Sequence, residues 1–165
     1  MKTVALLVNP TNPIAETTTT TIQAAARTLG LQLHVLHAST ERDFDSAFAT
    51  LVKVGAGGLV IGGDVLFVSG EKQIAKLAIR DRVLAIYQFR SFAAAGGLIS
   101  YGGDVIDQFH RVGIYTGRIL KGEKPGELPV QQSTKIELFI NVKTAKAIGL
   151  DVPPSLLARA DEVIE

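Results

Sequence analysis

Short, uninterrupted apolar runs recur through the first hundred residues, and each is followed by a polar turn and an amphipathic segment. The clearest runs are residues 3–8, 59–61 and 83–87. Runs without polar alternation are typical of strands buried on both faces of a parallel sheet. Because helical periodicity fills the segments between them, the pattern predicts an α/β fold, an open parallel sheet with helices on both faces.

The remaining elements of this region fit the same plan. Further strands are predicted at residues 31–36 and 98–101, and helices at residues 15–29, at 40–53 with Thr40 as N-cap, and from Ser69 onward. Right-handed crossovers make this arrangement flavodoxin-like. We therefore expect residues 1–101 to form one α/β lobe.

The rest of the chain does not continue this pattern. Asp104 is predicted to cap a long helix that carries an apolar stripe and ends near residue 120. A proline-containing crossing, a strand at 135–140, a helix at 142–148 and a terminal helix from Pro153 follow. We expect residues 102–165 to cross hinges and to pack on a second lobe or on a partner chain.

Composition excludes several classes of function. The formal charge of +1 predicts no strong attraction to nucleic acid or to an anionic membrane surface. Cysteine is absent, so disulfides and thiolate chemistry are excluded. No apolar run reaches the ~20 residues that a membrane span needs, and the first run is too short for a signal peptide.

Polar residues follow the predicted strands, where ligands bind in open α/β sheets. The candidates for ligand binding are Asn9, Asn12, Asp64, Gln88 and Tyr101, with Arg90 and Ser100 beside them. The carboxylate could pair with an ammonium group, the amides and hydroxyl could bind a carboxylate, and the aromatic ring could stack. Turn formation alone also favours Asn, Asp and Gly at such positions, so this alternative stays open.

Motifs for other chemistry are missing from the sequence. The glycine-rich stretches lack the spacing of dinucleotide or triphosphate loops, so no cofactor is predicted. The three histidines are not at metal-ligand spacing, so no metal is predicted. No serine has a nucleophile-elbow context and no catalytic residue is assigned, so we do not expect an enzyme.

Three segments near the C-terminus read GGLISYG, ILKGEKPGELPVQQSTKIELFINVKTAKAIGL and PPSLLARADEVIE. Together they resemble the C-terminal end of bacterial ABC-transporter solute-binding proteins, periplasmic binding proteins of the two-lobed, type I-like kind. VALLVNPTNP, GDVLF and AIYQFRSFAAAGGLISYG are similar to earlier segments of that family. The resemblance covers nearly the whole chain. It rests on these segments occurring together in this order, because no single one of them is specific to the family.

That resemblance implies a protein that closes on a small amino-acid-like solute, tryptophan-type substrates included, and delivers it to an ABC permease. It also implies a periplasmic location, an export signal and a complete first lobe. Neither signal nor first lobe is seen in the sequence as written, so a cytoplasmic location is expected if that sequence is complete. The family's strand-end positions match the five candidate residues.

Without a first lobe, the helix at residues 104–120 would expose its apolar face. We therefore expect a homodimer, with this helix packed on or swapped onto a second copy. Two other functions stay open. One is a small flavodoxin-like enzyme with Asp64 as its only obvious acid or base. The other is a dimerising module that has lost ligand binding.

Overall fold

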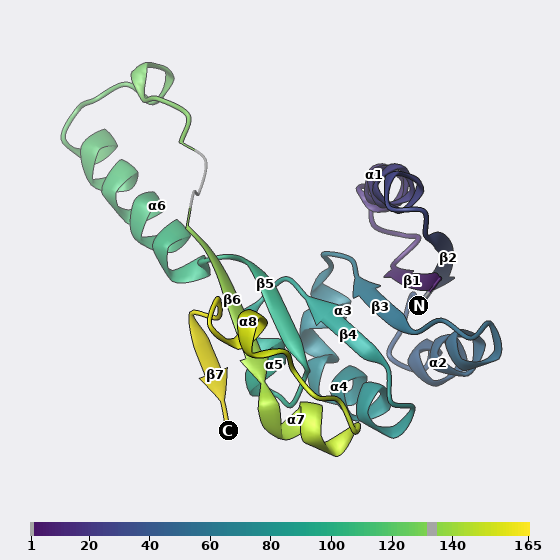
Figure 1. The fold of residues 1–165 in the computed structure, drawn as a ribbon. Helices are drawn as coiled ribbons and strands as arrows, with labels where there is room; N and C mark the ends of the chain where they lie inside the picture. Colours follow the sequence, from purple (N-terminus) through teal and green to yellow (C-terminus); the bar gives the residue numbers. More distant parts are fainter. Residues whose placement is uncertain (1, 132–134) are drawn as a thin grey trace.

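A computed structural model describes residues 2–131 and 135–165 as one seven-stranded sheet with flanking helices (Figure 1). The strands are β1 (Thr3–Val8), β2 (Gln32–His37), β3 (Gly58–Ile61), β4 (Leu84–Tyr87), β5 (Ile99–Gly103), β6 (Ile136–Asn141) and β7 (Glu162–Ile164). The helices are α1 (Ala15–Thr28), α2 (Asp43–Lys53), α3 (Val65–Ser69), α4 (Glu71–Arg80), α5 (Arg90–Ala94), α6 (Val105–Leu120), α7 (Val142–Ala147) and α8 (Pro154–Leu157), with a 3₁₀ turn η1 (Pro125–Glu127). None of the helices in these two ranges is long and apolar enough to cross a membrane.

The strand order is β2-β1-β3-β4-β5-β6-β7, and the first five strands are mutually parallel. This confirms the predicted α/β fold with a mostly parallel sheet. One pairing differs, because β6 runs antiparallel to β5, and β7 runs parallel to β6. The chain leaves β5 at the carboxyl edge, passes through α6 and returns to the same edge, so β6 must run in the opposite direction (Figure 1).

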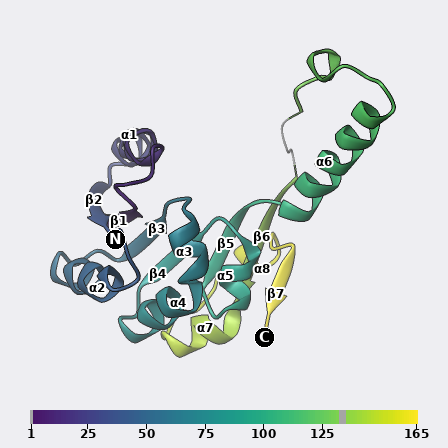
Figure 2. The same ribbon diagram turned by 180° about the vertical axis from the view of Figure 1, so that it is seen from behind.

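Helices cover both faces of the sheet, and the topology explains which helix lies where. The step from β1 to β2 crosses the sheet in one direction, and all later steps as far as β5 cross it in the other. Right-handed crossovers therefore place α1 on one face and α2, α4 and α5 on the opposite face. Figure 2 shows α3, α4 and α5 together on that second face.

The core lies between the sheet and the helices on this second face. It contains most of the fully buried aromatic side chains: Phe44, Phe48, Phe67, Tyr87 and Phe92. The last two rings stack with centroids 4.4 Å apart. Burial of these rings contributes, together with the buried aliphatic side chains, to the driving force for folding.

Helix α6 projects away from the sheet (Figures 1 and 2). The sequence prediction of this helix and its cap is confirmed, since Asp104 accepts hydrogen bonds from the backbone N–H groups of Ile106 (2.8 Å) and Asp107 (3.1 Å). None of its residues is buried, and Ile106, Phe109 and Leu120 are 81%, 72% and 82% exposed. The apolar stripe is therefore present and uncovered in this chain.

One prediction of local structure was wrong, and one strand was not predicted. Thr40 does not cap α2: its own N–H and hydroxyl, with the Ser39 N–H, donate to the Asp43 carboxylate instead. The final short helix predicted from Pro153 is confirmed as α8, but the sequence pattern did not predict the strand β7 that follows it. Strand β7 pairs with the edge of β6 that faces away from β5 and so satisfies its backbone groups. Just before β7, the Asp161 carboxylate accepts a hydrogen bond from the Leu138 N–H of β6 at 2.8 Å.

The segments after residue 101 lie in two different parts of the fold. Strands β6 and β7 join the sheet of the first hundred residues, whereas α6 and the loop behind it extend outward. The proposed boundary between residues 1–101 and 102–165 stays a prediction.

Candidate functional site

The strand order reverses direction between β1 and β3, so the connections that follow these two strands diverge to opposite faces. In open α/β sheets, this divergence opens a crevice at the carboxyl edge where ligands bind. Asn9 and Asn12 follow β1, and Asp64 follows β3. Three of the five predicted site residues therefore lie at this point of the sheet.

These three side chains are in direct contact. The Asp64 Oδ2 atom accepts from Asn12 Nδ2 at 2.6 Å and from Asn9 Nδ2 at 3.2 Å. The other carboxylate oxygen, Oδ1, accepts from the Leu66 N–H at 2.8 Å and so caps α3. The carboxylate therefore joins two loops and a helix end.

The amide oxygens of the two asparagines are also occupied. Asn9 Oδ1 accepts from the N–H and the hydroxyl of Thr11, at 3.0 and 2.8 Å. Asn12 Oδ1 accepts from the Ile14 N–H at 3.0 Å. We call Asn9, Asn12 and Asp64 the switch-point cluster; most of its hydrogen-bonding capacity is used within the fold.

The switch-point cluster holds its carboxylate in the ionised form. Partial burial of Asp64 opposes ionisation, but the hydrogen bonds from Asn12, the Leu66 N–H and Asn9 outweigh it. The pKa of Asp64 is consequently lowered from its usual value of 3.8. A carboxylate of this kind can accept hydrogen bonds or face a cation, but it is a poor general acid near neutral pH.

Gln88 links the switch-point cluster to the second part of the site. Its amide lies against Gly63, where an added Cβ atom would come within 2.8 Å of the Gln88 Nε2 atom. On its other side, a Cβ atom at Gly102 would collide with the backbone carbonyl of Gln88. Gly102 is therefore needed for the close approach of β5 to the end of β4, whereas a side chain at Gly63 would displace only the flexible end of Gln88.

A cavity of about 570 Å³ opens beside Gln88, bordered by α5, the start of α6 and strands β5 to β7. This volume is within the range of small-molecule sites, ~300–1,000 Å³. Strand register places five of its lining residues on one face of the sheet, because Ser100 pairs with Phe139, Gly102 with Glu137, and Phe139 with Glu162. We call this space the β5–β6 cavity.

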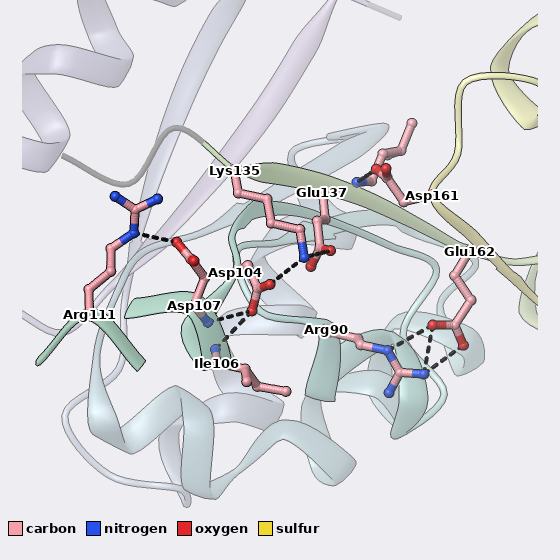
Figure 3. A network of polar contacts seen from close by, with 10 residues as sticks. Arg90, Asp104, Ile106, Asp107, Arg111, Lys135, Glu137, Asp161 and Glu162 are labelled. Carbon is pink, nitrogen blue, oxygen red and sulfur yellow. Dashed lines mark hydrogen bonds and ion pairs between the residues drawn. The ribbon is translucent and has the colours of Figure 1, made fainter. Parts of the chain in front are cut away.

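Ion pairs surround the β5–β6 cavity (Figure 3). Lys135 Nζ lies 2.5 Å from Asp104 Oδ2 and 2.9 Å from Glu137 Oε1, so it ties the start of α6 to β6. Arg90 binds Glu162 with two guanidinium nitrogens, at 2.6 to 2.9 Å, and also lies over the ring of Phe139. Hydrogen bonding to Lys135 lowers the pKa of Asp104, and hydrogen bonding to Glu162 raises the pKa of Arg90.

One polar group at the β5–β6 cavity is not used by the fold. Ser100 is 1% exposed and lines the cavity, and its Oγ atom has no hydrogen-bond partner among the described residues. Buried hydroxyl groups are nearly always paired, so each exception needs an explanation.

Tyr101 lies apart from both regions. It is 56% exposed and points to the face of β5 opposite Ser100, as strand alternation requires. The sequence pattern did identify Arg90 and Ser100 as polar residues beyond strand ends. It gave no reason to select Lys135, Glu137 or Glu162, because their position depends on the antiparallel pairing of β6.

No group of three His, Asp or Glu side chains within residues 2–131 and 135–165 is arranged to hold a metal ion. The site consists of amides, carboxylates, two cations, the hydroxyl groups of Ser91 and Ser100, and apolar walls. Such an arrangement can bind an organic solute through hydrogen bonds and charge.

Comparison with known proteins identifies the family. The chain belongs to the ABC transporter substrate binding proteins, whose family pattern matches residues 1–164. This confirms the resemblance noted in the sequence. A search of the curated proteins gives no match.

Solved structures share the fold. A conserved domain protein from Vibrio cholerae O1 biovar El Tor is 23% identical with a TM-score of 0.89, and the match covers 98% of this chain and 54% of that protein. An ABC domain from Streptococcus pneumoniae, solved in complex with L-Trp, is 23% identical with a TM-score of 0.87 over 99% of this chain and 55% of its own.

A third structure is an open, ligand-free substrate-binding protein with adhesive properties from Clostridium difficile. It is 20% identical with a TM-score of 0.75, over 99% of this chain and 54% of its own. The chain therefore spans about half the length of the structures it resembles.

Proposed function

We propose that this chain is the solute-binding component of an ABC-type importer, or its C-terminal lobe, and that it binds a small amino-acid-like solute at the carboxyl edge of its sheet. The observation that carries this proposal is a cavity of about 570 Å³ at the carboxyl edge of the sheet, lined by Gln88, whose amide also lies against Gly63 beside the switch-point cluster. Family membership and the L-Trp complex of one structural relative support it.

In this proposal, the binding residues are Asn9, Asn12, Asp64, Gln88 and Tyr101. The first three present a fixed, ionised polar surface, and Gln88 reaches the cavity. Tyr101 lies on the face of β5 opposite the cavity, so its exposed ring would stack on a part of the solute, or on a covering surface, that lies outside the cavity. The permease partner and a periplasmic location follow from the family and are part of the same proposal.

Binding without turnover fits the site better than catalysis. The alternative enzyme would need Asp64 as its acid or base, but two amides and a backbone N–H already bind that carboxylate. Their effect on its pKa keeps the carboxyl group ionised near neutral pH.

Thermal-shift measurements with the twenty amino acids, together with native mass spectrometry, test the proposed function. We expect at least one amino acid to raise the melting temperature in proportion to its concentration, as binding to the native state requires. The solute should be recovered chemically unchanged after incubation. No shift with any amino acid at millimolar concentration would overturn the proposal.

We further propose that a second copy of the chain covers α6. Its apolar face is uncovered, with Ile106, Phe109, Val112 and Leu120 between 61% and 82% exposed. Covering these side chains is favourable at about 25 cal/mol per Å² of apolar area.

Light scattering after size-exclusion chromatography tests this dimer. The wild-type chain should elute with twice the monomer mass, and Phe109→Asp should shift it toward monomer. Gln108→Asp, which adds the same charge on a neighbouring exposed position, is the matched control. A wild-type monomer at all concentrations would overturn the dimer but leave solute binding standing.

A further inference from the structure

The β5–β6 cavity contains hydrogen-bonding capacity that the fold leaves unused. The Ser100 Oγ atom is buried, borders the cavity and has no partner among the residues that the structure describes. Burying a hydroxyl without a partner destabilises a folded chain. A bound solute that exchanges a hydrogen bond with this group would remove that penalty, which favours a ligand at this position.

The charges around the β5–β6 cavity favour a cationic group over an anionic one. Two cations, Arg90 and Lys135, and three carboxylates, Asp104, Glu137 and Glu162, line it. Both cations are already engaged, the first by one carboxylate and the second by two. An incoming carboxylate would have to displace one of these partners, whereas an ammonium group would meet carboxylate oxygens that can accept further bonds.

Glu137 is the best placed of the three carboxylates. Asp104 is used by the N-terminus of α6 as well as by Lys135, and Glu162 is bound by two nitrogens of Arg90. Among the described residues Glu137 has a single cationic partner, and it points to the same face of the sheet as Ser100, two pairs further along the β5–β6 ladder. Its side chain is 20% exposed, so it is shielded from solvent but accessible from the cavity.

Much of the remaining wall is apolar. Phe89 and Phe139 contribute aromatic rings, and Val68, Val105 and Ile106 contribute aliphatic surface. A solute with an apolar or aromatic body and one polar end would match this lining.

We propose that the β5–β6 cavity binds the ammonium end of a small solute that has an apolar or aromatic body, with Ser100 and Glu137 as its polar contacts. The inference rests on the proposed function and goes further by assigning the place and the charge of the group that is recognised. The switch-point cluster then lies on the far side of Gln88 from the ammonium group.

Three probes with the same indole ring test the charge preference by isothermal titration calorimetry on the full chain. L-Tryptophan carries both charged groups, tryptamine lacks the carboxylate, and indole-3-propionate lacks the ammonium group. We expect tryptamine to bind within about tenfold of L-tryptophan and indole-3-propionate to bind at least about tenfold more weakly than tryptamine, a factor that corresponds to ~1.4 kcal/mol.

Two variants test the assigned contacts. Ser100→Ala should weaken tryptamine binding by about fivefold, and Glu137→Gln by about tenfold, because the second contact is charge-assisted. Glu127→Gln is the matched control, since this exposed carboxylate lies in η1 and does not line the cavity. Melting temperatures of all variants show that each remains folded.

The outcomes separate the two proposals. Tighter binding of indole-3-propionate than of tryptamine, or unchanged tryptamine binding in both variants, would overturn the cavity assignment. If L-tryptophan or another amino acid still binds, the proposed function stands. If no probe and no amino acid binds, both proposals fail.

Discussion

The switch-point cluster and the β5–β6 cavity lie at the same edge of one sheet, but they use their polar groups differently. In the cluster, the Asp64 carboxylate is bound by Asn9, Asn12 and a helix N–H, and the asparagine oxygens close their own turns. In the cavity, the ion pairs are partly exposed and the buried Ser100 hydroxyl has no partner among the described residues.

This difference separates what holds the site together from what is available to a ligand. A hydrogen-bonded group that is already satisfied gains little from a solute, because it must give up one bond to form another. A buried group without a partner gains a full bond. We therefore expect substitutions in the cluster to act mainly on stability, and substitutions in the cavity to act mainly on affinity.

The largest expected effect is the loss of stability on replacing Asp64 by Ala. The change removes the cap of α3, which is typically worth ~1 kcal/mol, and the charge-assisted hydrogen bonds from two amides, which contribute about 1.5–3 kcal/mol each at most. We expect the free energy of unfolding in urea to fall by about 3 kcal/mol.

Asp64→Asn is the control for this experiment, because it keeps the shape and one acceptor oxygen for the cap. It should cost clearly less than the alanine substitution. A loss below about 0.5 kcal/mol in the alanine variant, the usual range for a surface substitution, would show that the cluster does not hold these loops together.

The next effect is a dependence of stability on acid pH. The pKa of Asp64 in the fold is below its usual value of 3.8, because hydrogen bonds from Asn12, Leu66 and Asn9 exceed the effect of burial. A lowered pKa stabilises the fold above pH ~4, and that stabilisation is lost as the pH falls through the folded value. The wild type should therefore lose stability below pH ~4.

Chemical denaturation at a series of pH values measures this loss. The series should run from about pH 2 to about pH 6, which covers the range in which carboxyl groups titrate. Asp64→Asn should show a shallower decline than the wild type. Some decline should persist, because hydrogen bonding to Lys135 also lowers the pKa of Asp104. Identical profiles for the variant and the wild type would contradict the assignment to Asp64.

The sequence was sufficient for the parts of this comparison that depend on local pattern. Buried apolar runs predicted β1, β3 and β4, and the strand-end rule brought Asn9, Asn12 and Asp64 to one place, where the structure joins them. The sequence was not sufficient where the position of a residue depends on pairing between strands that are far apart in the chain. The antiparallel return of β6 and the added strand β7 place Glu137 and Glu162 at the cavity, and no local periodicity indicates that.

Local capping was also harder to predict than strand placement. The sequence pattern predicted Thr40 as the cap at the start of α2. In the structure the Asp43 carboxylate accepts from the residues before the helix, so the bonding runs in the opposite direction. Both arrangements satisfy backbone groups, so residue type alone does not distinguish them.

A smaller contribution to the free energy of unfolding is expected from the ion pair between Arg90 and Glu162. Both side chains are substantially exposed, at 52% and 41%, so solvent screens their attraction. In a double-mutant cycle with Arg90→Gln and Glu162→Gln, we expect a coupling energy of about 1 kcal/mol or less at low salt. The coupling should decrease further as salt is added.

A coupling well above that range would show that the pair holds β7 on the sheet and is not free to exchange partners with a solute. The same measurement at Lys135 and Glu137 gives a comparison within the cavity, because that pair also has one well-exposed member.

The smallest change in stability is expected for Ser100→Ala, although this residue is 1% exposed. Truncating a buried side chain usually destabilises a protein, but here it removes a hydroxyl that has no partner among the described residues. The two effects oppose each other, so we expect a change within about 0.5 kcal/mol in urea denaturation.

Thr144→Val is the matched comparison for Ser100→Ala, because it also removes a hydroxyl from a buried residue. The Thr144 hydroxyl donates to the Gly96 carbonyl at 2.9 Å, so its loss leaves that acceptor unpaired and should cost about 1–3 kcal/mol. If Ser100→Ala costs as much as Thr144→Val, the serine hydroxyl has a partner within the folded chain. A near-neutral Ser100→Ala that still weakens tryptamine binding would instead show that this hydroxyl serves the solute and not the fold.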